Sequence, residues 1–458
     1  MEMRGTPRIV IAGVNSGSGK TTISAGLMRA LVNRGLVVQG FKTGPDYIDP
    51  NCHRWATERP GRNLDTYLMN QAQVQASFCR GAAGADVAVI EGVMGMFDGA
   101  GGGGEVGSTA YLAKLLQAPV VLVIDARACA RSAAAIALGF RMFDPAVRLA
   151  GVICNRVGSE GHAQMLREAL ESVGIPMLGA LHHDAHLRVT EDRLGLALPG
   201  GTGSLPGWME RAGELVERHV DLDQVLALAN AAGPVVMAEP DPSFAAAAAG
   251  RYAGLRIAVG LDAAFWFYYE DTFDLLRHWG VEIRFFSPES DEQLPPGVHG
   301  LYLGGGFPER RAGALSANLP MRTAVMAAWL RRLPVLAECG GYLYLLEGLT
   351  GEDGVVYPMA GCIPGVARLQ PRLQGMGYRT AEPLGIRGHL FHYSRVEGGG
   401  GPPAWRLFRS NGEFERADGY RSDHAVASYL HVHHATQPAA MEAFLEQCRR
   451  YKEERGNG

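Results

Sequence analysis

The chain has 458 residues, which is too long for one hydrophobic core, so two or three domains are expected. A hydrophobic share of 47%, a charged share of 20% and a formal net charge of −4 argue against a nucleic-acid or anionic-membrane partner. Seven cysteines without CxxC spacing suggest neither a zinc site nor a disulfide framework. We therefore expect a cytoplasmic protein. Its oligomeric state stays open, with a homodimer as one option.

The first part of the chain alternates apolar segments with helical patterns. Strands are predicted at 8–12, 37–41, 87–91, 120–125 and 149–155, and a helix at 21–34. Strands that alternate with helices predict a parallel, doubly wound α/β sheet of the P-loop type. We assign residues 1–200 to this domain.

The composition changes after residue 200. Gly-Pro turns, a helical pattern over 207–229 and a run of five alanines indicate a helix and linker over 201–252. A second α/β pattern follows, and we assign residues 253–458 to it. Its predicted strands are 255–260, 281–286, 300–303 and 335–337, and residues 355–428 favour strands and turns.

A glycine-rich segment, GVNSGSGKTT, lies between the first predicted strand and helix. Gly17 and Gly19 let consecutive N–H groups point at phosphate oxygens, and the helix N-terminus adds a favourable partial charge. Lys20 can reach phosphates, and the hydroxyls of Thr21 and Thr22 follow it, with Thr21 suited to Mg²⁺. The spacing is one residue longer than in the usual P-loop. This longer form resembles dethiobiotin synthetase and its ATP-dependent relatives.

Two acidic segments follow the second and third predicted strands: TGPDYIDP and EGVMGMFDG. Asp46 and Asp49 stand on a proline-constrained loop that suits Mg²⁺ or an anionic substrate. Glu91 ends its strand, and Asp98 lies in the loop after it. Ligands of doubly wound sheets bind beyond the carboxyl ends of the strands, so these segments should converge. Asn155 ends a further strand, where it could read adenine or cap its loop.

Cys339 stands where a short apolar strand ends, in LAECGGYLYL, and two glycines and a helical pattern follow. This layout lifts the thiol onto a tight turn and turns the N–H of Gly340 toward a developing oxyanion. The segment YLGGGFPE offers a second oxyanion N–H at Gly305 or Gly306. A buried packing thiol and a plain glycine-rich turn are the alternatives.

A nucleophilic thiol needs a base, and the segment SYLHVHH offers histidines. It is predicted as a strand entering a turn, with His431 and His433 on the same face. A metal-binding histidine cluster is the alternative. It is weakened because no cysteine or acid stands at ligand spacing.

These segments resemble, in matching order over almost the whole chain, the family of cobyrinate-type a,c-diamide synthases. That family joins a dethiobiotin synthetase-like ATP domain to a class I glutamine amidotransferase domain. TGPDYIDP and EGVMGMFDG are its most specific motifs, and TGPDYIDP argues against cobyric acid synthase. Residues 193–196 give a weaker match. In GHLFHYS, Leu390 replaces the family's acid, so we assign no role there.

The resemblance implies amidation of the a- and c-acetate carboxylates of cobyrinate through an acyl phosphate, with ATP, Mg²⁺ and L-glutamine. Cys339 would form a γ-glutamyl thioester, and His431 would activate it, with His433 in reserve. The same chemistry on hydrogenobyrinate or nickel-sirohydrochlorin stays open. A different class is a partitioning-type ATPase switch with an inactive amidotransferase domain.

The expected sites comprise these residues: for ATP, Gly17, Gly19, Lys20, Thr21, Thr22, Lys42 and Asn155; for Mg²⁺, Thr21, Asp46 and Glu91; for the tetrapyrrole, Asp46 and Tyr47; as catalytic acids, Asp49, which would help order the acceptor, and Asp98, which would assist carboxylate activation; for the oxyanion, Gly305, Gly306 and Gly340.

Overall fold

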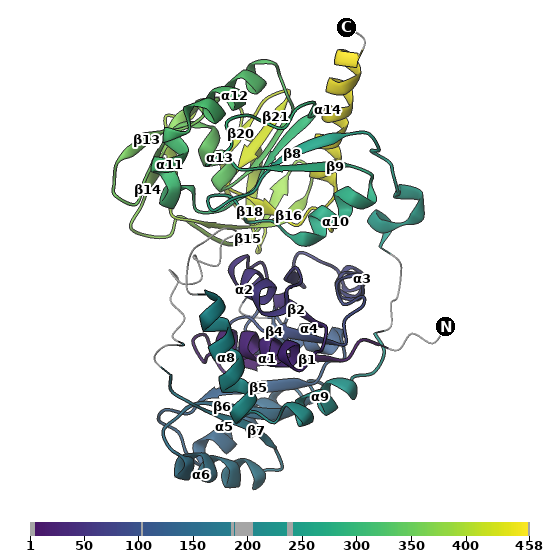
Figure 1. Ribbon diagram of the computed structural model, residues 1–458, viewed down its shortest axis with the longest axis vertical. Helices are drawn as coiled ribbons and strands as arrows, with labels where there is room; N and C mark the ends of the chain where they lie inside the picture. Colours follow the sequence, from purple (N-terminus) through teal and green to yellow (C-terminus); the bar gives the residue numbers. More distant parts are fainter. Residues whose placement is uncertain (1–4, 102–103, 185–186, 188–204, 236–240, 457–458) are drawn as a thin grey trace. The chain divides into compact units, whose positions relative to one another are not determined.

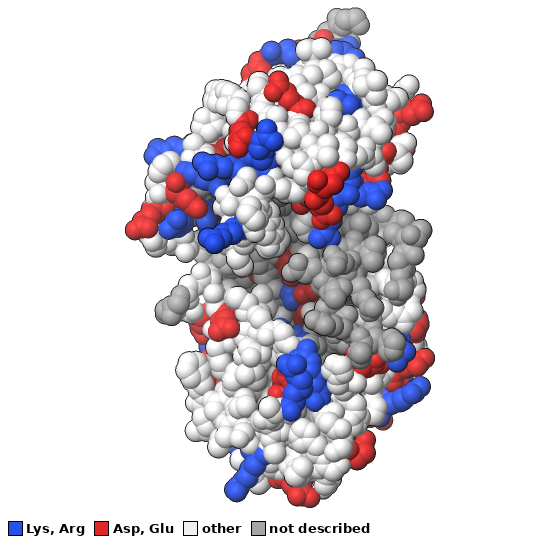
Figure 2. All heavy atoms as spheres, turned by 90° about the vertical axis from the view of Figure 1, so that its left-hand side faces the viewer, with Lys and Arg blue, Asp and Glu red and all other residues white. Residues whose placement is uncertain are grey.

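The computed structural model describes residues 5–101, 104–184, 187, 205–235 and 241–456, which form two compact units (Figure 1). The first unit holds the described residues up to 235, and the second holds those from 241 on. The weak motif at 193–196 lies outside the described residues. None of the described helices is long and apolar enough to cross a membrane. Basic and acidic side chains are interspersed on the face drawn in Figure 2.

The first unit is built on a seven-stranded parallel sheet in the order β3-β2-β4-β1-β5-β6-β7. Its strands are β1 (Arg8–Gly13), β2 (Val38–Thr43), β3 (Arg62–Leu64), β4 (Val87–Glu91), β5 (Val120–Asp125), β6 (Leu149–Val157) and β7 (Met177–His182). Its helices are α1 (Lys20–Asn33), α2 (Ile48–Thr57), α3 (Gln71–Gly81), α4 (Thr109–Leu115), α5 (Ser132–Phe143), α6 (Glu160–Glu171), α8 (Leu205–His219) and α9 (Leu222–Asn230).

The sheet is covered on both faces. Successive residues of β1 point to opposite faces: Val10 packs in one buried cluster, and Ile9 and Ile11 pack in another. Every residue of β1 is buried, which explains why its sequence is a continuous apolar run rather than an alternating one. The structure thereby confirms the predicted doubly wound architecture.

The helical pattern over 207–229 forms two helices rather than one. Helix α8 ends at His219. Asp221 then caps α9 by accepting a hydrogen bond from the backbone N–H of Gln224 at 2.9 Å. Helix α8 packs against α1: a Cβ added at Gly26 would lie 2.6 Å from the carbonyl oxygen of Ala212. The helix that the sequence grouped with the linker is therefore part of the first unit's core.

The second unit contains a six-stranded sheet in the order β20-β21-β11-β10-β8-β9, in which only β20 is antiparallel to its neighbour. Two further sheets have the orders β13-β12-β14-β17 and β19-β18-β15-β16-β22. The strands are β8 (Arg256–Gly260), β9 (Glu282–Phe286), β10 (Gly300–Leu303), β11 (Val335–Glu338), β12 (Leu346–Thr350), β13 (Val356–Pro358), β14 (Ile363–Leu369), β15 (Gly375–Glu382), β16 (Ile386–His392), β17 (Ser394–Glu397), β18 (Trp405–Arg409), β19 (Phe414–Asp418), β20 (Tyr420–Arg421), β21 (Ala425–Ser428) and β22 (His431–Val432).

The described part of the second unit has fewer α-helices than that of the first. They are α10 (Glu270–His278), α11 (Ala312–Ala317), α12 (Leu319–Leu330), α13 (Gly340–Leu345) and α14 (Ala439–Gly456), with short 3₁₀ turns η2 (Pro242–Phe244), η3 (Ala246–Ala248) and η4 (Pro308–Arg311). The strand-rich character predicted for residues 355–428 is confirmed.

The segment SYLHVHH is not one continuous strand, so that prediction was wrong. Strand β21 belongs to the six-stranded sheet, whereas β22 pairs with β16 in another sheet. His433 begins a turn, in which its carbonyl oxygen accepts a hydrogen bond from the N–H of Thr436 at 3.0 Å. Because the chain changes sheets and then turns, the two-residue alternation ends, and His431 and His433 do not share a strand face.

We predict that Gly26→Ala destabilises the first unit. The added methyl would lie 2.6 Å from the carbonyl oxygen of Ala212 and 2.7 Å from Cγ2 of Val216, so α1 and α8 must move apart. We expect the free energy of unfolding to fall by about 1–3 kcal/mol, measured by urea denaturation.

Gly139→Ala in α5 is the matched control, because an added Cβ there meets no atom within 4 Å. It should leave the free energy of unfolding unchanged or raise it by about 0.5–1 kcal/mol. Equal effects of the two substitutions would contradict the packing described for α1 and α8.

Candidate functional site

The glycine-rich loop between β1 and α1 has a backbone that glycine alone adopts easily. Gly17 has φ +79° and Gly19 has φ +100°. A Cβ at Gly19 would lie 2.0 Å from Nδ2 of Asn155. That nitrogen donates to the carbonyl oxygen of Ser18 at 2.9 Å. The side chain of Asn155, on β6, therefore fixes the shape of the loop.

The loop opens into a cavity of about 720 Å³. Its lining includes most residues predicted for this site: Gly17, Gly19, Lys20, Thr21, Thr22, Lys42, Asp46, Glu91 and Asn155. Three predicted residues, Tyr47, Asp49 and Asp98, lie outside that lining. Sequence reasoning missed two arginines of the lining, Arg127 and Arg156. Arg127 follows β5, and Arg156 is the next-to-last residue of β6. Arg156 bonds the carbonyl oxygen of Gly17 at 2.9 Å.

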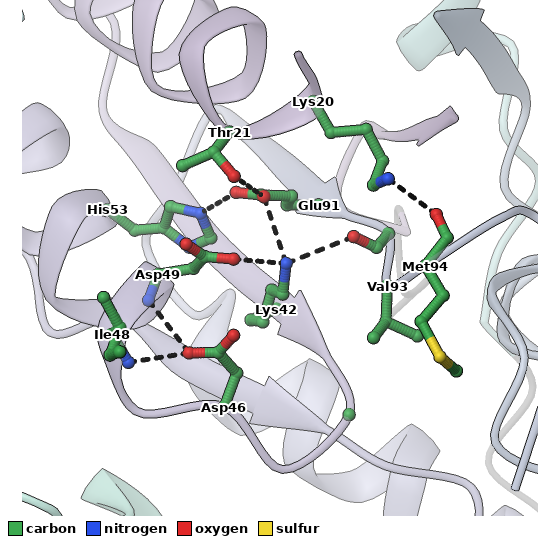
Figure 3. A network of polar contacts seen from close by, with 12 residues as sticks. Lys20, Thr21, Lys42, Asp46, Ile48, Asp49, His53, Glu91, Val93 and Met94 are labelled. Carbon is green, nitrogen blue, oxygen red and sulfur yellow. Dashed lines mark hydrogen bonds and ion pairs between the residues drawn. The ribbon is translucent and has the colours of Figure 1, made fainter. Parts of the chain in front are cut away.

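A buried network of charged side chains lies beside the loop (Figure 3). The amine of Lys42 contacts the carboxylate of Asp49 and lies 3.0 Å from Oε1 of Glu91. Glu91 also accepts a hydrogen bond from the hydroxyl of Thr21 at 2.7 Å, and its Oε2 lies 2.8 Å from Nε2 of His53. Glu91 and His53 are fully buried. The network thus joins α1, β2, α2 and β4 around one carboxylate.

The two carboxylates around Lys42 have opposite pKa shifts. Burial alone would raise the pKa of Glu91, but Lys42, His53 and Thr21 outweigh it and hold that pKa well below its usual range. Burial, together with Asp46 and Glu91, raises the pKa of Asp49 well above its usual range. Burial would lower the pKa of Lys42, but Asp49 and Glu91 raise it overall. Lys42 is therefore a permanent cation.

Asp49 does not lie on an open loop, contrary to the sequence prediction. It stands in the first turn of α2, where Pro50 is tolerated because that turn needs no intrahelical N–H. Asp46 precedes this helix, and its Oδ1 accepts hydrogen bonds from the first two helical N–H groups, those of Ile48 at 2.7 Å and Asp49 at 3.1 Å. His53, one helical turn after Asp49, could have been found from that spacing.

Asp98 has a local contact instead of a place in the cavity lining. Its Oδ2 accepts a hydrogen bond from the backbone N–H of Gly95 at 2.9 Å, and the side chain is exposed. Tyr47 is largely buried next to α2. The structure therefore brings the predicted ATP and Mg²⁺ residues together, but it does not bring Asp98 or Tyr47 to the same cavity.

The second centre surrounds Cys339, which follows β11. Its backbone has φ +44° and ψ −104°, a strained conformation for a residue with a side chain. The N–H of Cys339 donates to the carbonyl oxygen of Ser428 at 2.7 Å, which fixes the turn. A Cβ at Gly341 would lie 2.3 Å from the carbonyl oxygen of Leu303, so the turn requires glycine there. This geometry matches the predicted strand-to-helix elbow.

The predicted oxyanion residues gather at this elbow. Gly340 directly follows Cys339 and begins α13. A Cβ at Gly340 would lie 3.0 Å from the backbone nitrogen of Gly306, and one at Gly305 would lie 2.4 Å from Cε1 of His431. The glycine-rich loop after β10 therefore lies close to both the elbow and the imidazole of His431.

His431 and His433 have different surroundings. The ring of His431 stacks on that of His389, with 4.9 Å between centroids. Burial, and then His389, lowers the pKa of His431 to about 3. Nδ1 of His433 instead lies 3.1 Å from the hydroxyl of Thr436. Burial, and then the charge of Glu309, raises the pKa of Cys339 against an opposing effect of the Gly340 backbone. In this state the thiol keeps its proton and His431 is neutral.

Sequence reasoning missed Glu338, the residue directly before Cys339. Its buried carboxylate accepts hydrogen bonds from the N–H of Val432 at 3.1 Å and the hydroxyl of Tyr302 at 3.1 Å, and lies 3.0 Å from Nε2 of His434. Glu338 therefore joins the end of β11 to β10 and β22. An acid at the end of an apolar strand, next to a candidate nucleophile, was the available signal.

The pKa of Lys20 yields a test of the phosphate site. Burial, and then Lys42, lowers this pKa to about 8, so at pH 8.5 most Lys20 amines are neutral. Phosphate groups raise a lysine pKa, so ATP binding at pH 8.5 should take up roughly half a proton or more. Calorimetry in two buffers of different ionisation enthalpy measures this uptake.

At pH 6.5 Lys20 is already protonated, so its contribution to proton uptake should vanish. Equal uptake at the two pH values would contradict the assignment of Lys20 to the phosphates.

Comparison with known proteins covers both units. The CobQ/CobB/MinD/ParA nucleotide binding domain family matches residues 9–194, and the CobB/CobQ-like glutamine amidotransferase domain family matches residues 256–439. The cobyrinate a,c-diamide synthase of Priestia megaterium is 40% identical, with 98% of each chain covered. That of Dehalococcoides mccartyi strain CBDB1 is 39% identical, with 96% of this chain and 97% of the relative covered.

A further relative carries a different substrate in its name. The hydrogenobyrinate a,c-diamide synthase of Streptomyces coelicolor is 42% identical, with 97% of this chain and 98% of the relative covered. Identity of this size over nearly the full length places both units in one known lineage. The chain belongs to the family of cobyrinate and hydrogenobyrinate a,c-diamide synthases.

Proposed function

We propose that the protein converts cobyrinate to its a,c-diamide, with ATP and L-glutamine as co-substrates. The observation that supports this most is that one chain carries a phosphate loop with a buried acidic network and a strained cysteine elbow beside a histidine. A carboxylate is a poor acyl donor and needs activation, and ammonia needs a source. The two centres supply one function each.

The first unit would activate the carboxylate. Transfer of the γ-phosphoryl group of ATP to an acetate side chain gives an acyl phosphate and ADP, and ammonia then displaces phosphate to leave the amide. Lys20 would neutralise charge on the phosphates. Lys42 already contacts Asp49 and Glu91, so we expect it to orient these acids and to add positive potential. The catalytic roles of Asp49 and Asp98, and contact of Tyr47 with the tetrapyrrole, stay predictions.

The residues expected to hold Mg²⁺ have suitable chemistry. Thr21, Asp46 and Glu91 all line the cavity and carry the oxygen donors that Mg²⁺ prefers. Among the described residues no three His, Cys, Asp or Glu side chains form a metal cluster. We therefore expect Mg²⁺ to be held by few protein oxygens together with phosphate and water. When bound, it neutralises phosphate charge.

The second unit would supply ammonia. Cys339 attacks the carboxamide of glutamine and forms a γ-glutamyl thioester, and water later releases glutamate. His431, neutral at physiological pH, takes the proton of the thiol and passes it to the departing ammonia. The N–H groups of Gly340 and Gly306 would stabilise the oxyanion. The position of Gly305 against the His431 ring supports His431 over His433 in this role.

The proposal also names the tetrapyrrole whose carboxylates are amidated. The relatives are named for cobyrinate and for hydrogenobyrinate, so both acceptors deserve testing, with nickel-sirohydrochlorin as a third. ATP and glutamine are abundant in the cytoplasm, where we expect the protein to work.

Cys339→Ala should abolish amidation with glutamine and spare amidation with ammonium chloride, because only the ammonia source is lost. The assay combines the protein, ATP, Mg²⁺ and each acceptor, and mass spectrometry counts one or two amidations. Cys362→Ala is the matched control, since Cys362 is a buried thiol elsewhere in the same unit. No product on any acceptor with either nitrogen source would overturn the proposal and favour the ATPase switch.

Glu338→Gln should slow glutamine hydrolysis by roughly tenfold or more, because hydrogen bonds to a charged group contribute about 1.5–3 kcal/mol. The turnover number should fall while ammonia-driven amidation stays unchanged, since Glu338 positions the elbow and its histidine. Glu347→Gln, an exposed glutamate in β12, is the control. Equal loss with glutamine and ammonia would point to general misfolding instead.

A further inference from the structure

A second cavity, of about 520 Å³, lies in the second unit at the edge of the six-stranded sheet opposite to Cys339. Arg256 begins β8, and His299 directly precedes β10, whereas Cys339 directly follows β11. These strands are parallel. The cavity and the thiol therefore lie at opposite ends of the same strands. The volume is in the range of small-molecule sites.

Cationic side chains from three elements line this cavity: Arg256, Arg331, Lys452 and Arg455. No carboxylate belongs to its described lining, and none of the four cations has an ion-pair partner among the residues that the structure describes. The Nε of Arg256 is buried without a hydrogen-bond acceptor. Lys452 donates to the carbonyl oxygen of Gly254 at 2.9 Å, and Arg455 lies over the ring of Tyr451 at 4.8 Å.

Other arginines of this unit are commonly paired with acids. Arg251 lies 2.7 Å from Glu442, and the guanidinium of Arg332, next to Arg331 in the chain, contacts Asp423. The acid on the strand beside Arg256, Glu282, is already paired with Arg284 at 2.7 Å. Like charges gathered without counterions repel one another, so the cavity has a positive potential that favours an anion.

The environment of His299 agrees with this potential. Burial, and then the charges of Arg256 and Lys452, lowers its pKa, against an opposing effect of Glu282. Nδ1 of His299 accepts a hydrogen bond from the backbone N–H of Arg256 at 3.0 Å.

The rest of the lining is apolar. Leu294, Pro295, Pro296 and Val298 form one wall, and Tyr451 adds an aromatic ring. Arginine guanidinium groups bind phosphate oxygens through two parallel hydrogen bonds. Apolar side chains line most of the surface of small-molecule sites, where they contact the apolar faces of the ligand. The lining therefore suits a molecule with several phosphate charges and an organic ring.

We propose that this cavity binds a nucleoside diphosphate or triphosphate, with the phosphates among the four cations and the base against the proline-rich wall. The site is distinct from the nucleotide cavity of the first unit, because each cavity is lined by residues of one unit only. It thus adds a second nucleotide site to the chain.

Calorimetric titration of ADP into the full-length Lys20→Ala protein tests the proposal, because this background weakens the phosphate loop. One ADP should still bind per chain, and more weakly as the potassium chloride concentration rises. Adding Arg331→Ala and Lys452→Ala, both exposed side chains, should weaken that binding by about tenfold or more. Ammonia-driven amidation by Arg331→Ala/Lys452→Ala in the native Lys20 chain should equal that of the unmodified protein, which checks folding.

Arg332→Ala with Arg450→Ala is the matched control. Their replacement removes the same formal charge from the same region. Arg332 and Arg450 line a neighbouring cavity that shares Arg331, Tyr451 and Arg455 with the proposed site, but they do not line the proposed site itself. They should leave ADP affinity unchanged. Absence of ADP binding in the Lys20→Ala background, or equal weakening by both pairs, would overturn the proposal. Pyrophosphate that binds as tightly as ADP would overturn the role of the base and indicate an inorganic polyphosphate site.

Discussion

The ammonium group of Lys42 is the charge around which the first unit is arranged. A buried cation is tolerated only when acceptors surround it, and here Asp49, Glu91 and the carbonyl oxygen of Gly92 do so. Those acceptors come from α2 and from the end of β4. The position of α2 and the direction of the loop after β4 are therefore coupled to one side chain of β2.

Each of the two centres contains a buried glutamate at the end of a strand. Glu91 is the last residue of β4 and Glu338 the last of β11, and each of these strands has a parallel neighbour on both sides. Each carboxylate is buried and collects donors from neighbouring elements: Thr21, Lys42 and His53 around Glu91, and Tyr302, Val432 and His434 around Glu338. A buried carboxylate with such partners is costly to move. Both units thus hold their reactive loops rigidly at the carboxyl edge of a sheet.

Nine strands were predicted from apolar runs, and their ends differ by only one or two residues from those of β1, β2, β4, β5, β6, β8, β9, β10 and β11. Strands such as β1, β4 and β10 are buried along their whole length, so their sequences are continuous apolar runs. Strands β3 and β7 were not predicted. The phosphate loop and the Cys339 elbow could also be predicted from the sequence, since both need glycines at fixed positions. Other features depend on distant parts of the chain. The partners of Glu338 come from two distant segments, around Tyr302 and around Val432–His434. The change of sheet after Ser428 follows from pairing with β16. Pro50 indicated a loop, yet it fits the first turn of α2, so His53 was overlooked.

The packing of α8 on α1 has a consequence for how the chain can be divided. The nucleotide binding domain family match ends at residue 194, but the surface of α1 around Gly26 is closed by Ala212 and Val216. A shortened chain that stopped at 194 would leave that apolar surface in water and would tend to aggregate. An independently expressed first unit has to run through residue 235, so its boundary follows from helix packing rather than from sequence similarity.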